Sequence, residues 1–142
     1  MTSHLTAQDL KPKLDRARRA LAKSRRTVGA EHPLSTASAS RLAVILRRLE
    51  EYEEAEQLTR SVLAIREAEL GAEHLHTLQS RIELALILVR SGRPDEGRKI
   101  GAATLEVCQR TLEPTRPETR ECRAVIDEAH AAAGQAFING IV

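Results

Sequence analysis

The chain has 142 residues, enough for one domain, and its aromatic content is limited to Tyr52 and Phe137. Lysine and arginine (22) nearly balance aspartate and glutamate (20), which gives a formal net charge of +2, and no segment reaches the ~18 apolar residues that a membrane span requires. This composition argues against a membrane protein and predicts a cytoplasmic, all-α protein with an aliphatic core, because strong helix formers dominate.

Residues 10–28 are predicted to form one helix with a high positive charge. Before Ala30 there are eight basic residues and two acidic ones. The basic residues are Lys11, Lys13, Arg16, Arg18, Arg19, Lys23, Arg25 and Arg26. Pro12 falls in the expected first turn, where its missing N–H is tolerated. Such a run can bind nucleic acid or a membrane surface, but a solvated helix is the favoured interpretation, because no aromatic residues interleave for base stacking.

Residues 29–70 are predicted to form a helical hairpin. Ser35 or Thr36 can cap a first helix that runs to about Leu49, because apolar residues recur in it at three- and four-residue steps. A second helix is predicted from about Tyr52 to Leu70. The glycine that follows tolerates the left-handed conformation typical of helix C-termini.

Residues 71–112 repeat this unit without a gap. Thirteen residues of the first unit, including the Gly-Ala-Glu-His run that starts at Gly29, recur 42 positions later. Thr77 is therefore predicted to cap a helix that ends near Arg90, and Pro94 to open a second helix that ends at Thr111. A fixed repeat period is the signature of a stacked array.

Residues 113–142 are predicted to be a truncated repeat. Its first helix should span about Glu118 to Ala133, and Gly134, which lies 42 residues after Gly92, should end it before a short second helix from Gln135. Residues 10–28 align with a second helix and so form a partial repeat. The expected fold is a single domain over residues 1–142, a right-handed α-α superhelix of five or six antiparallel helices with repeats at 10–28, 29–70, 71–112 and 113–142.

The repeat resembles the tetratricopeptide repeat. The residues that carry the resemblance are the Gly-Ala-Glu-His-Pro run from Gly29, the small residues Ala43 and Ala85 within first helices, and the Tyr-Glu-Glu-Ala run from Tyr52. The 42-residue length is similar to the variant in kinesin light chains and in bacterial nucleotide-binding transcriptional regulators. The resemblance implies a small bacterial adaptor or regulator module without catalytic activity.

The resemblance also implies that first helices line a concave groove for a peptide or a partner helix. The partner-binding positions it selects are Ser40, Arg41, Val44, Arg47 and Arg48 in the first repeat, and Ile82, Glu83, Leu86, Val89 and Arg90 in the second. The third repeat contributes Glu121, Ala124, Val125, Glu128, Ala131 and Ala132.

Two features of these positions bear on binding. Residues 82–89 are apolar nearly all round, so Ile82, Leu86 and Val89 are either available to a partner or covered by flanking helices. Arg48 and Arg90 share one repeat position and could clamp a carboxylate. Alternatively, the arginines solvate a helix face or pair with nearby glutamates.

Catalytic, metal and cofactor sites are not predicted. Cys108 and Cys122 lack metal or redox spacing and are expected to be small buried thiols. His74 and His76 provide only two imidazoles, and His74 is already explained as the repeat counterpart of His32. No phosphate-binding loop or nucleophile motif occurs.

We therefore expect a non-catalytic module that binds a protein or peptide partner. One alternative is a homodimeric scaffold held together by the apolar tail Phe137, Ile138, Ile141 and Val142. A second alternative is a regulator that associates with nucleic acid through the basic first helix, with steeply salt-dependent binding.

Overall fold

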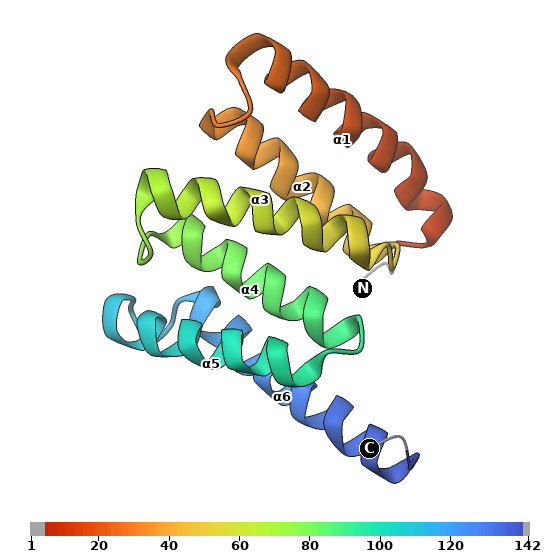
Figure 1. The fold of residues 1–142 in the computed structure, drawn as a ribbon, viewed down its shortest axis with the longest axis vertical. Helices are drawn as coiled ribbons and strands as arrows, with labels where there is room; N and C mark the ends of the chain where they lie inside the picture. The colour runs from red at the N-terminus through yellow and green to blue at the C-terminus, as the bar shows by residue number, and fades with distance from the viewer. Residues whose placement is uncertain (1–4, 141–142) are drawn as a thin grey trace. The chain divides into compact units, whose positions relative to one another are not determined.

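The computed structural model describes residues 5–140, and within this range the chain forms six α-helices and no strand (Figure 1). The helices are α1 (Ala7–Val28), α2 (Pro33–Arg48), α3 (Tyr52–Leu70), α4 (Leu75–Arg90), α5 (Pro94–Thr111) and α6 (Pro117–Ile138). The all-α prediction is confirmed. The chain divides into two compact units, of which the first ends at Ile65 and the second begins at Arg66. Helix α3 therefore contributes to both.

Two of the predicted repeats each contain one pair of helices. Residues 29–70 hold α2 and α3, and residues 71–112 hold α4 and α5. Gly71 and Gly92 follow the last residues of α3 and α4 closely and have φ angles of 90° and 94°. Glycine reaches this region without the steric cost of a Cβ atom, so both turns form where the sequence predicts them.

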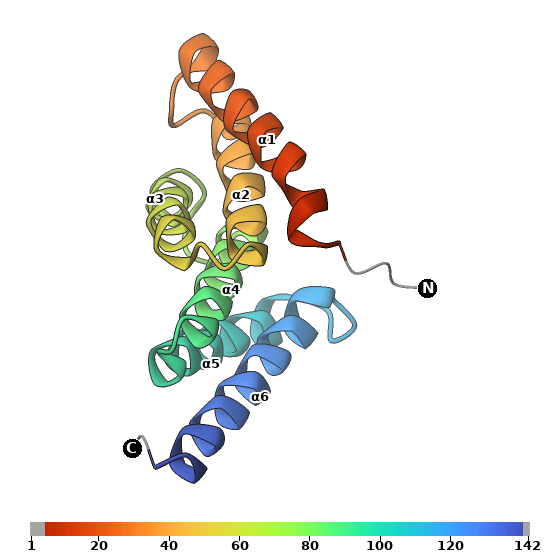
Figure 2. The ribbon, with the colours of Figure 1, turned by 90° about the vertical axis from the view of Figure 1, so that its right-hand side faces the viewer.

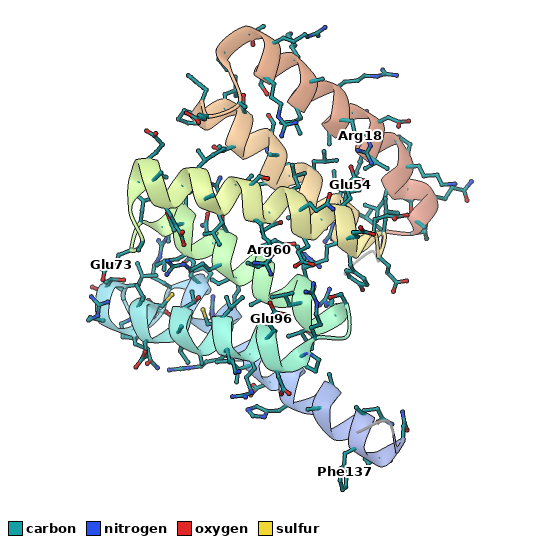
Figure 3. All side chains as sticks on the ribbon, viewed as in Figure 1. Arg18, Glu54, Arg60, Glu73, Glu96 and Phe137 are labelled. Atoms are coloured by element: carbon teal, nitrogen blue, oxygen red, sulfur yellow. The ribbon has the colours of Figure 1, made fainter. Side chains whose placement is uncertain are left out.

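In the first unit, α1 and α2 pack side by side and run in opposite directions (Figure 2). Leu10 and Leu21 of α1 and Leu46 of α2 are buried. Arg18 of α1 donates two hydrogen bonds to Glu54 of α3, with an Nη2–Oε2 distance of 2.8 Å (Figure 3). These hydrogen bonds lower the pKa of the Glu54 carboxyl and join α1 to the start of α3.

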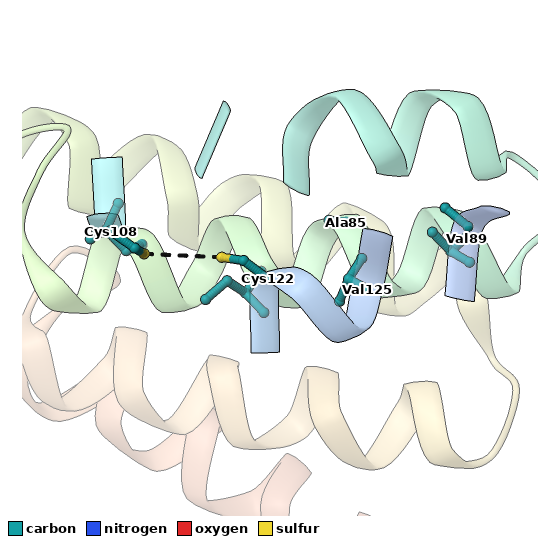
Figure 4. Close-up of a cluster of buried hydrophobic side chains, with 8 residues drawn as sticks. Ala85, Val89, Cys108, Cys122 and Val125 are labelled. Carbon is teal, nitrogen blue, oxygen red and sulfur yellow. Dashed lines mark hydrogen bonds between the residues drawn. The ribbon is translucent and has the colours of Figure 1, made fainter. Parts of the chain in front are cut away.

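In the second unit, α4, α5 and α6 share one buried cluster (Figure 4). The cluster consists of Leu78, Ile82, Ala85 and Val89 of α4, Cys108 of α5, and Cys122, Val125 and Ala129 of α6. The α4 members follow three- and four-residue steps, which place them on one helix face. Each of these three helices contacts the other two, so they enclose one common core.

A buried arginine fixes the end of α3 against the start of α4 within the second unit. Arg66 Nη1 donates to Ser80 Oγ at 2.8 Å and to the carbonyl oxygen of His76 at 3.2 Å. Burial lowers the pKa of this guanidinium. The repeat counterparts of Arg66 are Ser24 and Cys108, which are also buried, so this position faces inward at all three places where it occurs.

Histidine, not serine or threonine, caps α2 and α4. His32 Nδ1 accepts a hydrogen bond from the Leu34 amide, and His74 Nδ1 accepts one from the His76 amide, each at 3.1 Å. The predicted caps Ser35 or Thr36 and Thr77 are therefore wrong, and each helix begins earlier. Ser35 Oγ instead donates to the Gly29 carbonyl oxygen at 2.6 Å. Ser35 is not needed as a cap, because His32 in the preceding loop already supplies the acceptor.

Replacing His74 with alanine is expected to lower the free energy of unfolding by about 1 kcal/mol, because one amide at the start of α4 loses its acceptor. His74→Asp should retain most of this stability, since aspartate accepts the same hydrogen bond. Urea unfolding followed by circular dichroism measures both. Equal losses in the two variants would contradict the capping role.

The two terminal helices differ from the predictions. Helix α1 begins at Ala7 with Thr6 as its cap, where the Thr6 hydroxyl and the Asp9 carboxylate satisfy each other's backbone N–H groups. Pro12 therefore lies in the second turn, not the first. Helix α6 continues through Gly134 to Ile138, so the predicted turn is wrong. Gly92 is followed after one residue by Pro94, which fixes a new helix start, whereas no proline follows Gly134.

Within residues 5–140, no helix combines the length and the apolar character needed to cross a lipid bilayer.

Candidate partner-binding surfaces

The predicted positions of the first repeat all lie on α2 and are accessible to different extents. Arg41 and Arg48 are exposed, whereas Ser40, Val44 and Arg47 are half-buried. The spacing of Arg41, Val44 and Arg48 places these three side chains on one helix face. No carboxylate of residues 5–140 forms an ion pair with Arg41 or Arg48. This face therefore presents two guanidinium groups, one on each side of an aliphatic residue.

Two predicted positions on α4 are buried, which corrects the interpretation that they are available to a partner. The side chains of Ile82 and Val89 are only 6% and 4% exposed. They belong to the cluster that α6 covers. The alternative, burial by flanking helices, is correct for both. Leu86 and Glu83 are half-buried, so they are the partly accessible residues among these four positions.

Polar contacts link α4 to α6 beside the buried cluster. Arg90 Nε lies 2.9 Å from Glu128 Oε1, and Gln79 Nε2 donates to Glu118 Oε1 at 3.1 Å. The guanidinium of Arg90 is therefore engaged by a carboxylate of the same chain. Glu128 was not among the glutamates predicted to pair with the arginines, which were Glu50, Glu51 and Glu83. A ligand carboxylate would have to compete with Glu128 for this site.

Negative charge accumulates where α4 meets α6. Burial raises the pKa of the Glu121 carboxyl, and the nearby Glu118 and Glu83 raise it further. For Glu118 burial acts in the same direction, but its own backbone N–H, Gln79 and Arg116 outweigh it and lower the pKa. Glu83, Glu118 and Glu121 therefore lie close enough on this side of the second unit to disfavour one another's ionisation.

A pocket of about 330 Å³ lies between α1 and α2 in the first unit. Its lining residues are Lys13, Arg16, Ala17 and Ala20 of α1 and Ser38, Arg41 and Ile45 of α2. Within each set the residues are three or four positions apart, so they lie on the sides of α1 and α2 that face each other. The floor is small and aliphatic, and three cationic side chains surround it.

Only Arg41 connects this pocket to the predicted binding residues. In the sequence, Lys13 and Arg16 stand out only as members of the basic run before Ala30. A sequence signal existed, since both follow the spacing that puts them on the same face as Ala17 and Ala20. This spacing alone does not locate the pocket, because the sequence does not show which face of the first helix packs against α2.

Metal-binding groups of three or more side chains do not occur among residues 5–140. His74 accepts the helix-capping hydrogen bond through Nδ1, which gives it a structural role. The two cysteines are free and fully buried, with their sulfur atoms 4.0 Å apart (Figure 4). Burial raises the pKa of both thiols, that of Cys122 to about 12, so neither is activated as a nucleophile.

The end of α6 exposes two large hydrophobic side chains. Phe137 and Ile138 are 74% and 76% exposed, and Phe137 projects from the helix end (Figure 3). Ile141 and Val142, the other members of the predicted apolar tail, lie outside the described residues.

Comparison with known proteins identifies the repeat. Two profiles described as tetratricopeptide repeat match residues 34–96 and 77–118. The sequence has no match among curated proteins.

Solved structures share the fold. Two crystal structures of nearly identical TPR-like repeats, from a Podosopora anserina chain assigned to the kinesin light chains, are each 25% identical in sequence. One has a TM-score of 0.74 and the match covers 90% of this chain and 60% of that chain. The other has a TM-score of 0.71, with 90% and 61% covered. This chain thus spans less than two thirds of those chains. The chain belongs to the tetratricopeptide repeat family, as its paired helices, its 42-residue repeat and these matches show.

Proposed function

We propose that this chain is a non-catalytic adaptor that binds a protein partner, as a peptide or a helix, on the exposed side of its first helices. Tetratricopeptide repeats generally mediate protein–protein interaction and are typically non-catalytic. In an array, each repeat contributes one helix pair to an extended surface.

The arrangement of Arg41, Val44 and Arg48 on α2 supports the proposal most strongly. Both guanidinium groups are exposed and unpaired within residues 5–140, and Val44 between them is half-buried. Arginine binds carboxylates through two parallel hydrogen bonds. A partner with an aliphatic side chain between two acidic ones would complement this face.

On α4, Arg90 is not part of the proposed arginine clamp. Because Glu128 already engages Arg90, the arginine clamp is assigned to α2 instead of to the pair Arg48 and Arg90. Leu86 and Glu83 remain accessible enough to contact a partner. Their acidic surroundings would favour a basic or neutral segment there.

Reversing the charge of the α2 arginines is expected to abolish most of the binding. Peptides selected by the wild-type chain from a random display library should carry acidic residues near an aliphatic one. The variant Arg41→Glu with Arg48→Glu should bind them at least about tenfold more weakly, because two attractive contacts become repulsive. Fluorescence polarisation with a labelled selected peptide measures the dissociation constants.

The matched control is Arg19→Glu with Arg26→Glu, which makes the same charge change on exposed positions of α1 that do not line the pocket. It should leave binding within about twofold of the wild type. Unchanged circular dichroism verifies folding of both variants. Equal weakening in both would mean that only total charge matters and would refute the α2 assignment.

A homodimer is a second candidate, favoured by the exposure of Phe137 and Ile138. Exposed aromatic and aliphatic side chains at a helix end can bury each other between two copies. If so, the measured mass should fall from dimer to monomer on dilution, and Phe137→Ser with Ile138→Ser should be monomeric throughout. A wild-type chain that is monomeric at the highest concentration would dismiss this candidate.

A further inference from the structure

The two cysteines of the chain meet inside the second unit. Cys108 lies on α5 and Cys122 on α6, and their sulfur atoms are 4.0 Å apart (Figure 4). Both side chains are completely buried, and both are free thiols. The two positions are 14 residues apart in sequence, and the turn between α5 and α6 brings them together. The second unit therefore holds a pair of thiols instead of two isolated ones.

The repeat explains why these two side chains face each other. One repeat earlier, the same two positions are occupied by Arg66 and Ser80, and Arg66 Nη1 donates a hydrogen bond to Ser80 Oγ at 2.8 Å. In both cases the first residue lies on the second helix of one repeat, and its partner lies on the first helix of the next. The register of the array thus directs this pair of side chains toward each other, and at its later occurrence both members are cysteines.

We propose that Cys108 and Cys122 are a redox-sensitive pair that forms a reversible disulfide and thereby locks α5 to α6. A disulfide requires the two sulfur atoms to approach to about 2.05 Å. At 4.0 Å the sulfur atoms are already in contact, so no other side chain has to leave the space between them. This proposal is independent of the proposed partner binding, since neither thiol belongs to the exposed face of α2.

Hydrogen peroxide is the oxidant of the proposed reaction. The thiolate of one cysteine attacks a peroxide oxygen, the O–O bond breaks, and a sulfenic acid and water are the products after proton transfer. The thiolate of the other cysteine then attacks the sulfenic sulfur and expels hydroxide, which takes up a proton to become water. In total, two thiols lose two electrons and two protons, and one peroxide is reduced to two molecules of water.

Burial controls the rate of this reaction. Only the thiolate is nucleophilic, and burial raises the pKa of both thiols, so the closed structure reacts slowly with peroxide. Oxidation therefore proceeds when α6 opens locally, and closure then brings the second thiol onto the sulfenic acid. The lock consequently forms during sustained oxidation and, once formed, prevents the opening that allowed it.

The test uses the full chain, reduced and then incubated with an excess of hydrogen peroxide. The oxidised chain should run as a single chain on a non-reducing denaturing gel, lose about 2 Da in intact mass and retain no free thiol in urea. Trypsin should release residues 100–110 linked to residues 121–123, and dithiothreitol should separate them. The melting temperature should exceed that of the reduced chain by roughly 5–10 °C, because the bond restricts the unfolded chain.

The matched control moves one thiol to another side of α6. Cys122→Ser with Ala124→Cys keeps the number of thiols, but position 124 is exposed and therefore does not face the buried Cys108. This variant should form no disulfide within the chain, and its melting temperature should not rise on oxidation. An intrachain disulfide formed in it at the wild-type rate would show that pairing does not depend on the observed geometry.

Four results with the wild-type chain would overturn the proposal. The chain could retain both thiols after prolonged incubation, accumulate sulfinic acids instead of a disulfide, or become linked to a second copy. The fourth such result is an oxidised chain that melts no higher than the reduced one, because the disulfide would then not act as a lock.

Discussion

Replacing Gly97 with valine is expected to lower the free energy of unfolding by about 3 kcal/mol, because α4 and α5 approach each other too closely for any side chain there. A Cβ atom at this position would lie 2.6 Å from the Ala85 carbonyl oxygen and 2.6 Å from a methyl group of Val89. The oxygen belongs to the backbone of α4, so relief requires the helices to separate. Urea unfolding followed by circular dichroism measures the loss.

Alanine at this position provides the stricter test. Ala55 occupies the same place in the first repeat, and alanine is favoured over glycine within a helix by about 1 kcal/mol. Both arguments predict stabilisation by Gly97→Ala. The structure predicts the opposite, a loss of about 1 kcal/mol, because the contact with Ala85 costs more than the helix propensity returns.

Gly134 is the matched control, since it also lies inside a helix but a Cβ there would meet nothing within 4 Å. Gly134→Ala should therefore raise the free energy of unfolding by about 0.5–1 kcal/mol. If Gly97→Ala were stabilising by the same amount, the close approach of α4 and α5 would be refuted.

Raising the pH from 9 to 11 is expected to destabilise the wild-type chain by roughly 2 kcal/mol more than a Cys122→Ala variant. Burial, and then the neighbouring Cys108, raise the pKa of the Cys122 thiol from its usual 9.0 to about 12. The unfolded chain therefore releases this proton above pH 9, while the folded chain retains it.

The sign follows from the raised pKa of the folded state. The stabilisation from the protonated thiol is fully present below pH 9 and is lost as the pH rises toward 12. Urea unfolding of both proteins at the two pH values, with a reducing agent present, isolates Cys122 because all other titrating groups are shared. The same pH dependence in both would show that Cys122 ionises as readily when folded as when unfolded.

The sequence predicted most of the fold because helical periodicity is local. The apolar steps in residues 29–70 and 71–112 place helices close to where α2 to α5 lie, and Gly71 and Pro94 mark boundaries correctly. The caps were predicted wrongly because serine and threonine are the commoner acceptors, and only the loop geometry shows that His32 and His74 reach the first free amides.

The candidate surfaces depended more on packing between distant helices. The sequence positions of Ile82 and Val89 do not distinguish them from residues exposed in a groove, yet α6 covers both side chains. Similarly, Glu128 reaches Arg90 from a helix 38 residues away, and no spacing rule anticipates that pair.

By itself, the amino-acid order determined the helices, their 42-residue period and the aliphatic nature of the interior, because these depend on neighbours within one or two turns. The tertiary structure alone decided which side of each helix is covered. It buried Ile82, Val89 and Val125, which were expected to bind a partner, and placed Lys13 and Arg16 beside Arg41, because contact between helices depends on how their faces are rotated toward each other.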